Sequence, residues 1–216
     1  MIKAVSFDLD GTLINEKIDE IFWFEEIPKL AARTHKISYE SAKKNAMEKY
    51  EEADRQEKDI SWYGTEKWER FFNIKIEAEK MIKEIKERME KNSENIIFPE
   101  TLLVLKELKK RNIKLILITH STNEFLKTKM EMTGIAQYFN LIISTISDMK
   151  SIKNDECYKE ICRKNNLSPS EILHIGDSIN YDVEMPKRAG MNCLLIDRKK
   201  YTPNSIENLK EVLKLV

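Results

Sequence analysis

The sequence has few cysteines and no long hydrophobic run. Its three cysteines are Cys157, Cys162 and Cys193. None has the paired spacing of a zinc site, and an odd number gives no complete disulfide framework, which is typical of a reduced, intracellular compartment. No apolar stretch approaches the roughly 20 residues that cross a bilayer, and the apolar segment 2–7 is too short for a signal peptide. We therefore expect a cytoplasmic protein with no membrane partner.

An excess of charge of either sign is also absent. Lysine plus arginine number 37, and aspartate plus glutamate number 37. Nucleic-acid-binding proteins normally show a basic excess, so we expect no nucleic-acid partner. The 216 residues are 41% hydrophobic and 34% charged. This composition allows a real core beneath a charged surface, in one domain or in a domain with an insertion.

Glycine and proline are scarce, at five each, and the segment 16–93 contains only Pro28 and Gly64 as helix breakers. The segment is rich in Glu, Lys, Ala and Met and has no convincing strand pattern. We predict that it is helical throughout.

The rest of the chain alternates apolar runs with amphipathic segments. The expected strands are 2–7, 113–118, 141–144, 172–175 and 192–196. One helix is expected to begin at Pro99. Four more are expected over 123–134, 154–165, 181–189 and 206–215. This alternation predicts a parallel sheet with helices on both faces, and such sheets carry their sites at the carboxyl ends of the strands.

Polar side chains fall at these strand ends. Asp8 and Asp10 follow the first strand, Thr119 ends the second, and Asp177 follows the fourth, with Asp182 about one helical turn later. Each has a plainer interpretation as a turn residue, a helix cap or an acid at a helix N-terminus. Carboxylates held close together repel one another unless a cation is bound, and a hard cation with oxygen ligands suggests Mg²⁺.

Two lysines, Lys150 and Lys153, lie on the expected loop after the third strand. Either one could simply be solvated. We favour Lys153 as a functional residue because it precedes the helix expected from Asn154, whose N-terminus adds positive potential.

Together these four segments resemble the four motifs of the haloacid dehalogenase (HAD) superfamily, over essentially the whole chain. The first is the strand that ends in Asp8–Thr12, the second is the strand that ends in Thr119, and the third is the lysine, Lys153. The fourth is Gly176-Asp177-Ser178 with Asp182. The helical segment resembles the cap of phosphoglycolate phosphatase-like and β-phosphoglucomutase-like members.

The resemblance implies an α/β fold, with a Rossmann-like parallel-sheet core over 1–15 and 94–216 and an inserted all-α cap domain over 16–93. It implies that Asp8 attacks phosphorus as the nucleophile and that Asp10 is the general acid and base. Mg²⁺ would be held by Asp8, by the main-chain carbonyl of Asp10 and by Asp177.

The resemblance also implies roles for the other motif residues. Thr119 and Lys153 would bind phosphoryl oxygens, and Asp182 would orient Lys153 or lie behind the metal ligands. His120 stands where the family usually has Asn, so it either contacts the substrate or makes local hydrogen bonds. Tyr181 and Asn154 also depart from the usual pattern, which puts close substrate analogies in doubt.

The function expected from the resemblance is that of a Mg²⁺-dependent phosphatase, a phosphoric monoester hydrolase acting on a small phosphorylated metabolite. We expect a monomer or a weak dimer. A sugar-phosphate mutase, a haloacid dehalogenase and a catalytically silent binding protein remain alternatives. The identity of the phosphate ester is not readable from the sequence, because specificity in this architecture comes from the cap.

Overall fold

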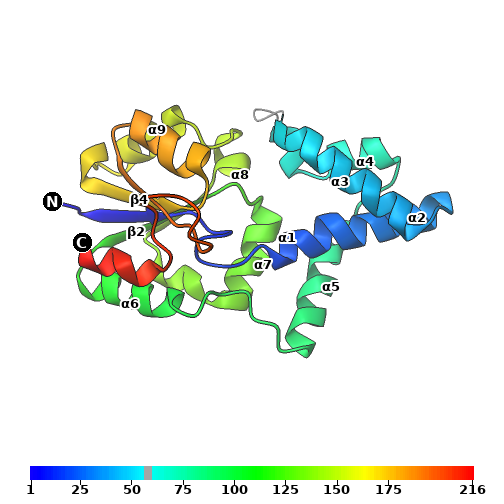
Figure 1. The fold of residues 1–216 in the computed structure, drawn as a ribbon, viewed down its shortest axis with the longest axis horizontal. Helices are drawn as coiled ribbons and strands as arrows, with labels where there is room; N and C mark the ends of the chain where they lie inside the picture. Colours follow the sequence, from blue (N-terminus) through cyan, green and yellow to red (C-terminus); the bar gives the residue numbers. More distant parts are fainter. Residues whose placement is uncertain (56–59) are drawn as a thin grey trace. The chain divides into compact units, whose positions relative to one another are not determined.

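A computed structural model describes residues 1–55 and 60–216, and it divides into two compact units (Figure 1). The first, here called the α/β unit, comprises Met1–Asn15, Ile96–His120 and Thr133–Val216. The second, the helical unit, comprises Glu16–Asn95 and Ser121–Met132. Among the described residues, no helix is long and apolar enough to cross a membrane.

The α/β unit is built on a five-stranded parallel sheet of order β3-β2-β1-β4-β5. The strands are β1 (Ala4–Phe7), β2 (Lys114–Thr119), β3 (Leu141–Ser144), β4 (Ile172–Gly176) and β5 (Asn192–Leu195). All four residues of the central β1 are buried, as expected where helices cover both faces of a parallel sheet.

The register brings the ends of the middle strands together. Phe7 of β1 is paired with Leu117 of β2 on one side and with Ile175 of β4 on the other. The residues that follow these positions therefore emerge at one edge of the sheet.

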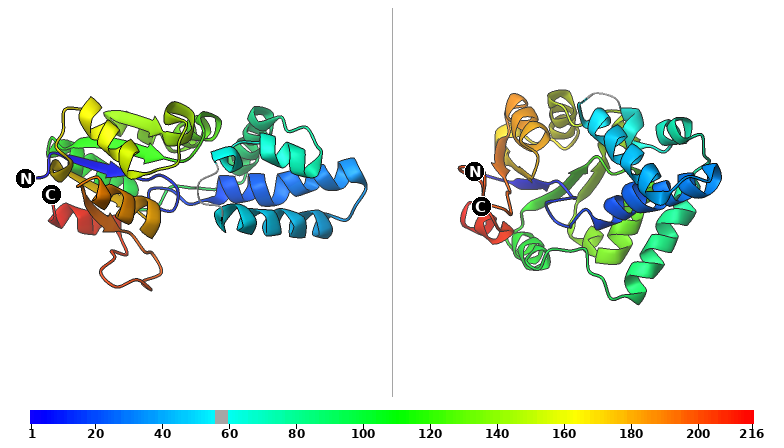
Figure 2. Two further views of the ribbon diagram at one scale, coloured as in Figure 1. Left: turned by 90° about the horizontal axis from the view of Figure 1, so that it is seen from above. Right: turned by 45° about the vertical axis from the view of Figure 1, so that its right-hand side comes forward.

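Helices cover both faces of this sheet. On one face, Tyr158 and Ile161 of α9 pack against Ile116 and Ile118 of β2, and the closing helix η6 lies beside α6 on the other face (Figures 1 and 2). The helical segments of this unit are α6 (Thr101–Lys110), η3 (Ile135–Tyr138), α8 (Thr145–Met149), α9 (Asp155–Lys164), η4 (Pro169–Glu171), η5 (Ile179–Glu184), α10 (Met185–Arg188) and η6 (Leu209–Lys214).

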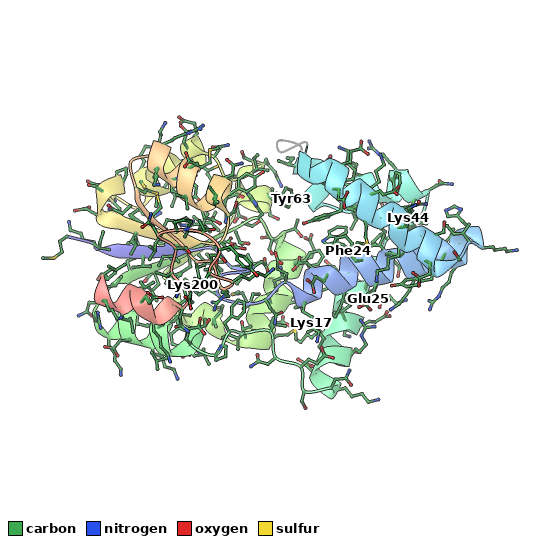
Figure 3. The ribbon with its side chains drawn as sticks, viewed as in Figure 1. Lys17, Phe24, Glu25, Lys44, Tyr63 and Lys200 are labelled. Carbon is green, nitrogen blue, oxygen red and sulfur yellow. The ribbon has the colours of Figure 1, made fainter. Side chains whose placement is uncertain are left out.

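The helical unit has an aromatic core. Trp23 stacks on Trp68 in this core, with ring centroids 5.2 Å apart. Outside the core, Phe24, labelled in Figure 3, meets the exposed Tyr50 edge-on at 5.0 Å. The helical segments of this unit are α1 (Lys17–Ile21), η1 (Phe22–Glu26), α2 (Ile27–His35), α3 (Tyr39–Arg55), η2 (Ile60–Tyr63), α4 (Glu66–Phe72), α5 (Ala78–Lys91) and most of α7 (Asn123–Thr133).

The fold class predicted from the sequence is confirmed, because the parallel sheet with its surrounding helices is present. The predicted strands agree with the observed ones to within two residues at each end. Within 16–93, the described residues 16–55 and 60–93 form no strand of the sheet.

The sequence-based division and the structural one differ at α7. The sequence analysis assigned all of 94–216 to the core, whereas the structure groups Ser121–Met132 with the helical unit. The physical reason is packing: Phe125 of α7 lies 4.9 Å from Phe22 and 5.8 Å from Trp23 between ring centroids. In addition, Lys129 Nζ lies 2.6 Å from Asp19 Oδ2.

Three local predictions need correction. The expected loop after β3 contains the short helix α8, which Ser144 caps by accepting a hydrogen bond from the Ser147 N–H. The single helix expected over 181–189 is instead η5 followed by α10, with Pro186 in the first turn of α10. The closing helix is a shorter 3₁₀ helix that begins after Asn208.

Candidate active site

Asp8 stands at the carboxyl end of the central strand. Its N–H continues the strand ladder by donating to the Ile175 carbonyl at 2.8 Å, and its side chain is buried. The chain then turns at Gly11, which has a φ of 71°, a conformation that residues with a Cβ rarely adopt. A Cβ at Gly11 would also lie 2.1 Å from Asp177 Oδ2. The glycine therefore permits both the turn and the approach of Asp177.

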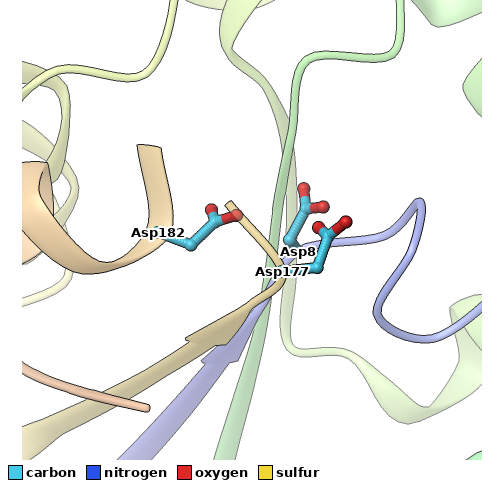
Figure 4. A group of neighbouring side chains, drawn as sticks. All are labelled: Asp8, Asp177 and Asp182. Carbon is cyan, nitrogen blue, oxygen red and sulfur yellow. The ribbon is translucent and has the colours of Figure 1, made fainter. Parts of the chain in front are cut away.

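A second glycine makes room for Asp182. Strand β4 ends at Gly176, and a Cβ there would lie 2.2 Å from Asp182 Cγ. Figure 4 shows the result: Asp177 lies beside Asp8, and Asp182 points towards them from the helical turn η5. One carboxylate oxygen of each of these three residues lies within 4.8 Å of the others.

Lys153 reaches this group from the segment before α9. Its side chain is 2% exposed, and its Nζ donates to Asp8 Oδ1 at 2.5 Å and to Asp182 Oδ1 at 2.8 Å. Lys150 is exposed and ends α8 in the left-handed conformation, with a φ of 53°. The structure thus brings Lys153, and not Lys150, to the carboxylates.

The charges of this cluster are strongly coupled. Burial raises the pKa of the Asp8 carboxyl, and the negative charges of Asp182 and Asp177 add to the rise, while Lys153 opposes it. Burial also disfavours ionisation of Asp182, but Lys153 and the hydrogen bond from His174 hold its pKa below the usual range. Although burial disfavours a charged Lys153, Asp182 and Asp8 raise its pKa. The Lys153 ammonium thus contacts two carboxyl groups, Asp8 and Asp182, and Asp177 lies in the same carboxylate cluster.

The donor set fits a hard divalent cation. The three clustered groups offer carboxylate oxygens, which are the ligands that Mg²⁺ prefers, and one ammonium leaves a net negative charge. The two glycines that admit Asp177 and Asp182 keep the donors close. The ligands expected from the sequence were the carboxylates of Asp8 and Asp177 and the main-chain carbonyl of Asp10. In the structure the carboxylates of Asp8 and Asp177 lie together with that of Asp182.

The two residues that end β2 have different surroundings. Thr119 is 1% exposed and is paired in register with Ser144 of β3. His120 is half-buried, and its Nε2 accepts a hydrogen bond from the main-chain N–H of Lys153 at 2.7 Å. Of the two roles left open by the sequence, the observed bond corresponds to the local one.

A buried polar chain lies behind Asp182, and the sequence analysis assigned it no role at the site. His174 Nε2 lies 3.1 Å from Asp182 Oδ1, and its Nδ1 lies 2.8 Å from Ser6 Oγ. The hydroxyl of Tyr158 lies 3.1 Å from the same Nε2 and donates to the Tyr181 carbonyl at 2.8 Å. The available signal was the occurrence of a serine and a histidine in two otherwise apolar strands, where they are partners in register.

Arg198, after β5, was also missed. Its guanidinium donates to the Thr12 carbonyl and to Glu100 Oε1, each at 2.7 Å, and lies 3.5 Å from the centre of the Phe98 ring. The loop that carries Asp10 is therefore fixed to the end of β5.

Comparisons with known proteins identify a matching family and several relatives. The model of the haloacid dehalogenase-like hydrolase family matches residues 2–190. A putative pyrophosphatase PpaX from Clostridium perfringens is 31% identical over 217 residues, covering 98% of this chain and 90% of that protein. The GMP/IMP nucleotidase YrfG from Escherichia coli is 23% identical over 177 residues, covering 82% of this chain and 75% of that protein.

A solved structure shows the same fold. The crystal structure of a HAD phosphatase from Thermococcus onnurineus matches with a TM-score of 0.83 at 23% sequence identity, and the match covers 99% of this chain and 97% of that one.

Proposed function

This chain belongs to the haloacid dehalogenase-like hydrolases, and from that premise we propose that it is a Mg²⁺-dependent phosphatase that forms a phospho-aspartate on Asp8. The observation that carries the proposal is the bond from the buried Lys153 ammonium to Asp8, at the end of the central strand and beside Asp177. In this proposal these side chains supply a nucleophile, a cation for the phosphoryl group and a carboxylate-rich metal site at one edge of the sheet.

In the first step Asp8 attacks phosphorus, and an acyl phosphate forms as the bond to the leaving oxygen breaks. Lys153 and the Thr119 hydroxyl bind the phosphoryl oxygens, where negative charge must be stabilised in the transition state. Because Lys153 already lies against Asp8, the attacking carboxylate and the incoming phosphoryl group share one ammonium.

Asp10 transfers the protons of the reaction. It follows Asp8 by two residues on the turn made at Gly11, close to the nucleophile along the chain. As an acid it protonates the leaving alkoxide, and as a base it then removes a proton from the water that hydrolyses the acyl phosphate.

Mg²⁺ would be held by the carboxylates of Asp8 and Asp177 and by the main-chain carbonyl of Asp10. When bound it offsets the repulsion between the nucleophile and the phosphate dianion. Asp182, which contacts Lys153 at 2.8 Å, orients that ammonium.

The substrate we propose is a small phosphorylated metabolite. Two relatives are named for the hydrolysis of pyrophosphate and of nucleoside monophosphates, so both compounds belong in a substrate panel. The helical unit, most of which is inserted between Asn15 and Ile96, is proposed to act as the cap that selects among such substrates. Insertions next to an active-site loop are well placed for this role.

The test is hydrolysis of p-nitrophenyl phosphate, followed by a panel of pyrophosphate, GMP, IMP, phosphoglycolate and hexose phosphates. We expect turnover with Mg²⁺, and its loss on addition of EDTA or in Asp8→Asn, which is nearly isosteric. Undiminished activity in either case would remove the proposed metal or nucleophile. Isomerisation of a sugar phosphate in place of its hydrolysis would indicate a mutase.

A further inference from the structure

His120 makes a contact that the reaction outlined above does not use. It directly follows Thr119, the last residue of β2, yet its Nε2 accepts a hydrogen bond from the main-chain N–H of Lys153, 33 positions further along the chain. The donor–acceptor distance is 2.7 Å, which is short for an N–H donor. Its ring also meets Tyr181 edge-on, with centroids 4.8 Å apart and an interplanar angle of 84°.

From this contact we infer that His120 is a positioning residue, which fixes the backbone of Lys153 so that the ammonium lies on Asp8. The inference rests on the proposed function, in which Lys153 binds the transferring phosphoryl group. His120 then acts through Lys153 and does not itself touch the substrate.

The segment that carries Lys153 explains the need for such an acceptor. Helix α9 begins at Asp155 and its cap is Asn154, whose side chain accepts from the Cys157 N–H at 2.9 Å. Lys153 therefore stands just outside the helix, where its own N–H has no helical carbonyl to bind. A buried N–H without a partner would be costly, and His120 supplies the acceptor.

Lys153 is thereby held at both ends. A lysine side chain is a flexible four-carbon stem with a point charge at its tip, so the contacts of the ammonium with Asp8 and Asp182 do not fix its base. The bond from the Lys153 N–H to His120 fixes the base. Tyr181, which packs against His120, directly precedes Asp182, so both anchors of Lys153 belong to one packed group.

The chemical state of His120 agrees with this role. Burial and the nearby positive charge of Lys153 lower the pKa of His120 to about 3, so the ring is neutral at ordinary pH. A neutral imidazole whose Nε2 accepts a hydrogen bond must carry its proton on Nδ1. It cannot then pair with a phosphate dianion as a cation.

Three substitutions distinguish the contribution of the His120 hydrogen-bond acceptor from that of its ring. His120→Gln places an amide oxygen at the chain length of Nε2 and loses the ring, whereas His120→Phe keeps a ring against Tyr181 and loses the acceptor. His120→Asn is the matched control, since its amide reaches only as far as Nδ1. We expect kcat to fall about 10–100-fold for Phe and for Asn, the usual effect of removing a partner that orients a functional residue. We expect Gln to stay within about 3-fold of wild type, and KM to change little throughout.

A double mutant tests whether His120 acts through Lys153. In a Lys153→Met background, His120→Phe should cost nothing further, because residues that act as one unit are not additive. A full additional loss, or a rise in KM with kcat unchanged in all three single variants, would mean that His120 contacts the substrate and would overturn the inference.

An NMR measurement judges the contact without any assay. In uniformly ¹⁵N-labelled protein at pH 7 we expect a scalar coupling between the Lys153 amide nitrogen and His120 Nε2, and an Nδ1–H tautomer. Absence of the coupling would overturn the inference. If wild-type protein hydrolyses no ester while the coupling is present, the proposed function fails, and His120 remains the anchor of the Lys153 backbone.

Discussion

At the scale of single residues, the two lysines before α9 have opposite surroundings although they are three positions apart. Lys153 is 2% exposed and contacts two carboxylates, whereas Lys150 is exposed at the end of α8. We predict that Lys153→Ala lowers turnover of a phosphate ester about 10²–10³-fold, as for other donors to a transition state. Lys150→Ala, the matched control, should stay within about 2-fold of wild type.

The measurement is kcat at saturating Mg²⁺ with one ester for all variants. Lys153→Arg should not rescue activity, because a planar guanidinium cannot replace a compact ammonium between Asp8 and Asp182. A large fall for Lys150→Ala together with near-normal Lys153→Ala would contradict the assignment.

The residues of this edge differ in how far the sequence could predict them. Asp8 and Asp177 were predictable because each directly follows an apolar strand, and parallel strands end at one edge. The hydrogen bond between His120 and the Lys153 main chain could not be predicted, because its partners are 33 residues apart and a main-chain donor has no sequence signature. Which carboxylates lie together also depends on the space that Gly11 and Gly176 leave for Asp177 and Asp182.

At the scale of elements, the loop after β1 is fixed to the segments around it by one guanidinium. Arg198, which follows β5, binds the Thr12 carbonyl and Glu100, whose side chain is 5% exposed. We predict that Arg198→Ala lowers the free energy of unfolding by about 3 kcal/mol, because it leaves a buried carboxylate without its partner. Arg198→Ala combined with Glu100→Leu should recover part of this loss. Urea denaturation at pH 7 measures the free energy of unfolding of the single and the double variant. Equal losses in the two variants would contradict the proposal that the unpaired Glu100 carboxylate causes the loss.

The same pair predicts a pH dependence. Burial disfavours ionisation of Glu100, but the hydrogen bond from Arg198 outweighs it and lowers its pKa below the ordinary value. A carboxyl with a lowered folded pKa adds stability above its unfolded value of about 4.3, and this stability is lost as the pH falls through the folded pKa. As the pH falls from 5 to 3, the free energy of unfolding should therefore decrease less in Glu100→Gln than in wild type. The difference between the two decreases is the contribution of this one carboxyl group.

Prediction of the elements succeeded where a pattern was long and failed where it was short or depended on a partner. The strands were recognisable from apolar runs, but α8 has only five residues, fewer than two turns of periodicity. Helix α7 was predicted at nearly its observed bounds, but the sequence analysis placed it in the core, whereas the structure groups most of it with the helical unit. Periodicity shows that a helix has an apolar face; it does not show that Phe125 of that face packs on Phe22 and Trp23.

At the scale of the whole molecule, the division into units decides how the proposed cap can be tested. Replacing 16–93 alone by a short linker would leave α7 without its partners, exposing Phe125, which is 4% exposed in the intact protein, and the fully buried Lys129. An excised core made in this way should aggregate because α7 presents an unpaired apolar face. Its failure to fold would then say nothing about the cap.

A repaired excision gives a sharper test. Residues 16–95 are replaced by a glycine-serine linker, and Phe125→Ser with Leu126→Gln replaces two buried apolar side chains of α7 by polar ones. The α/β unit keeps its own sheet and core, so we expect cooperative unfolding and slow, Mg²⁺-dependent hydrolysis of p-nitrophenyl phosphate.

Without contacts from the helical unit, the ratio of kcat/KM between the best and the poorest ester should fall at least about 10-fold, because discrimination is the difference in transition-state binding between substrates. The intact chain with the same two substitutions is the control. If the repaired core folds and ranks the esters as the intact chain does, selection resides in the α/β unit and the helical unit is not the selecting cap.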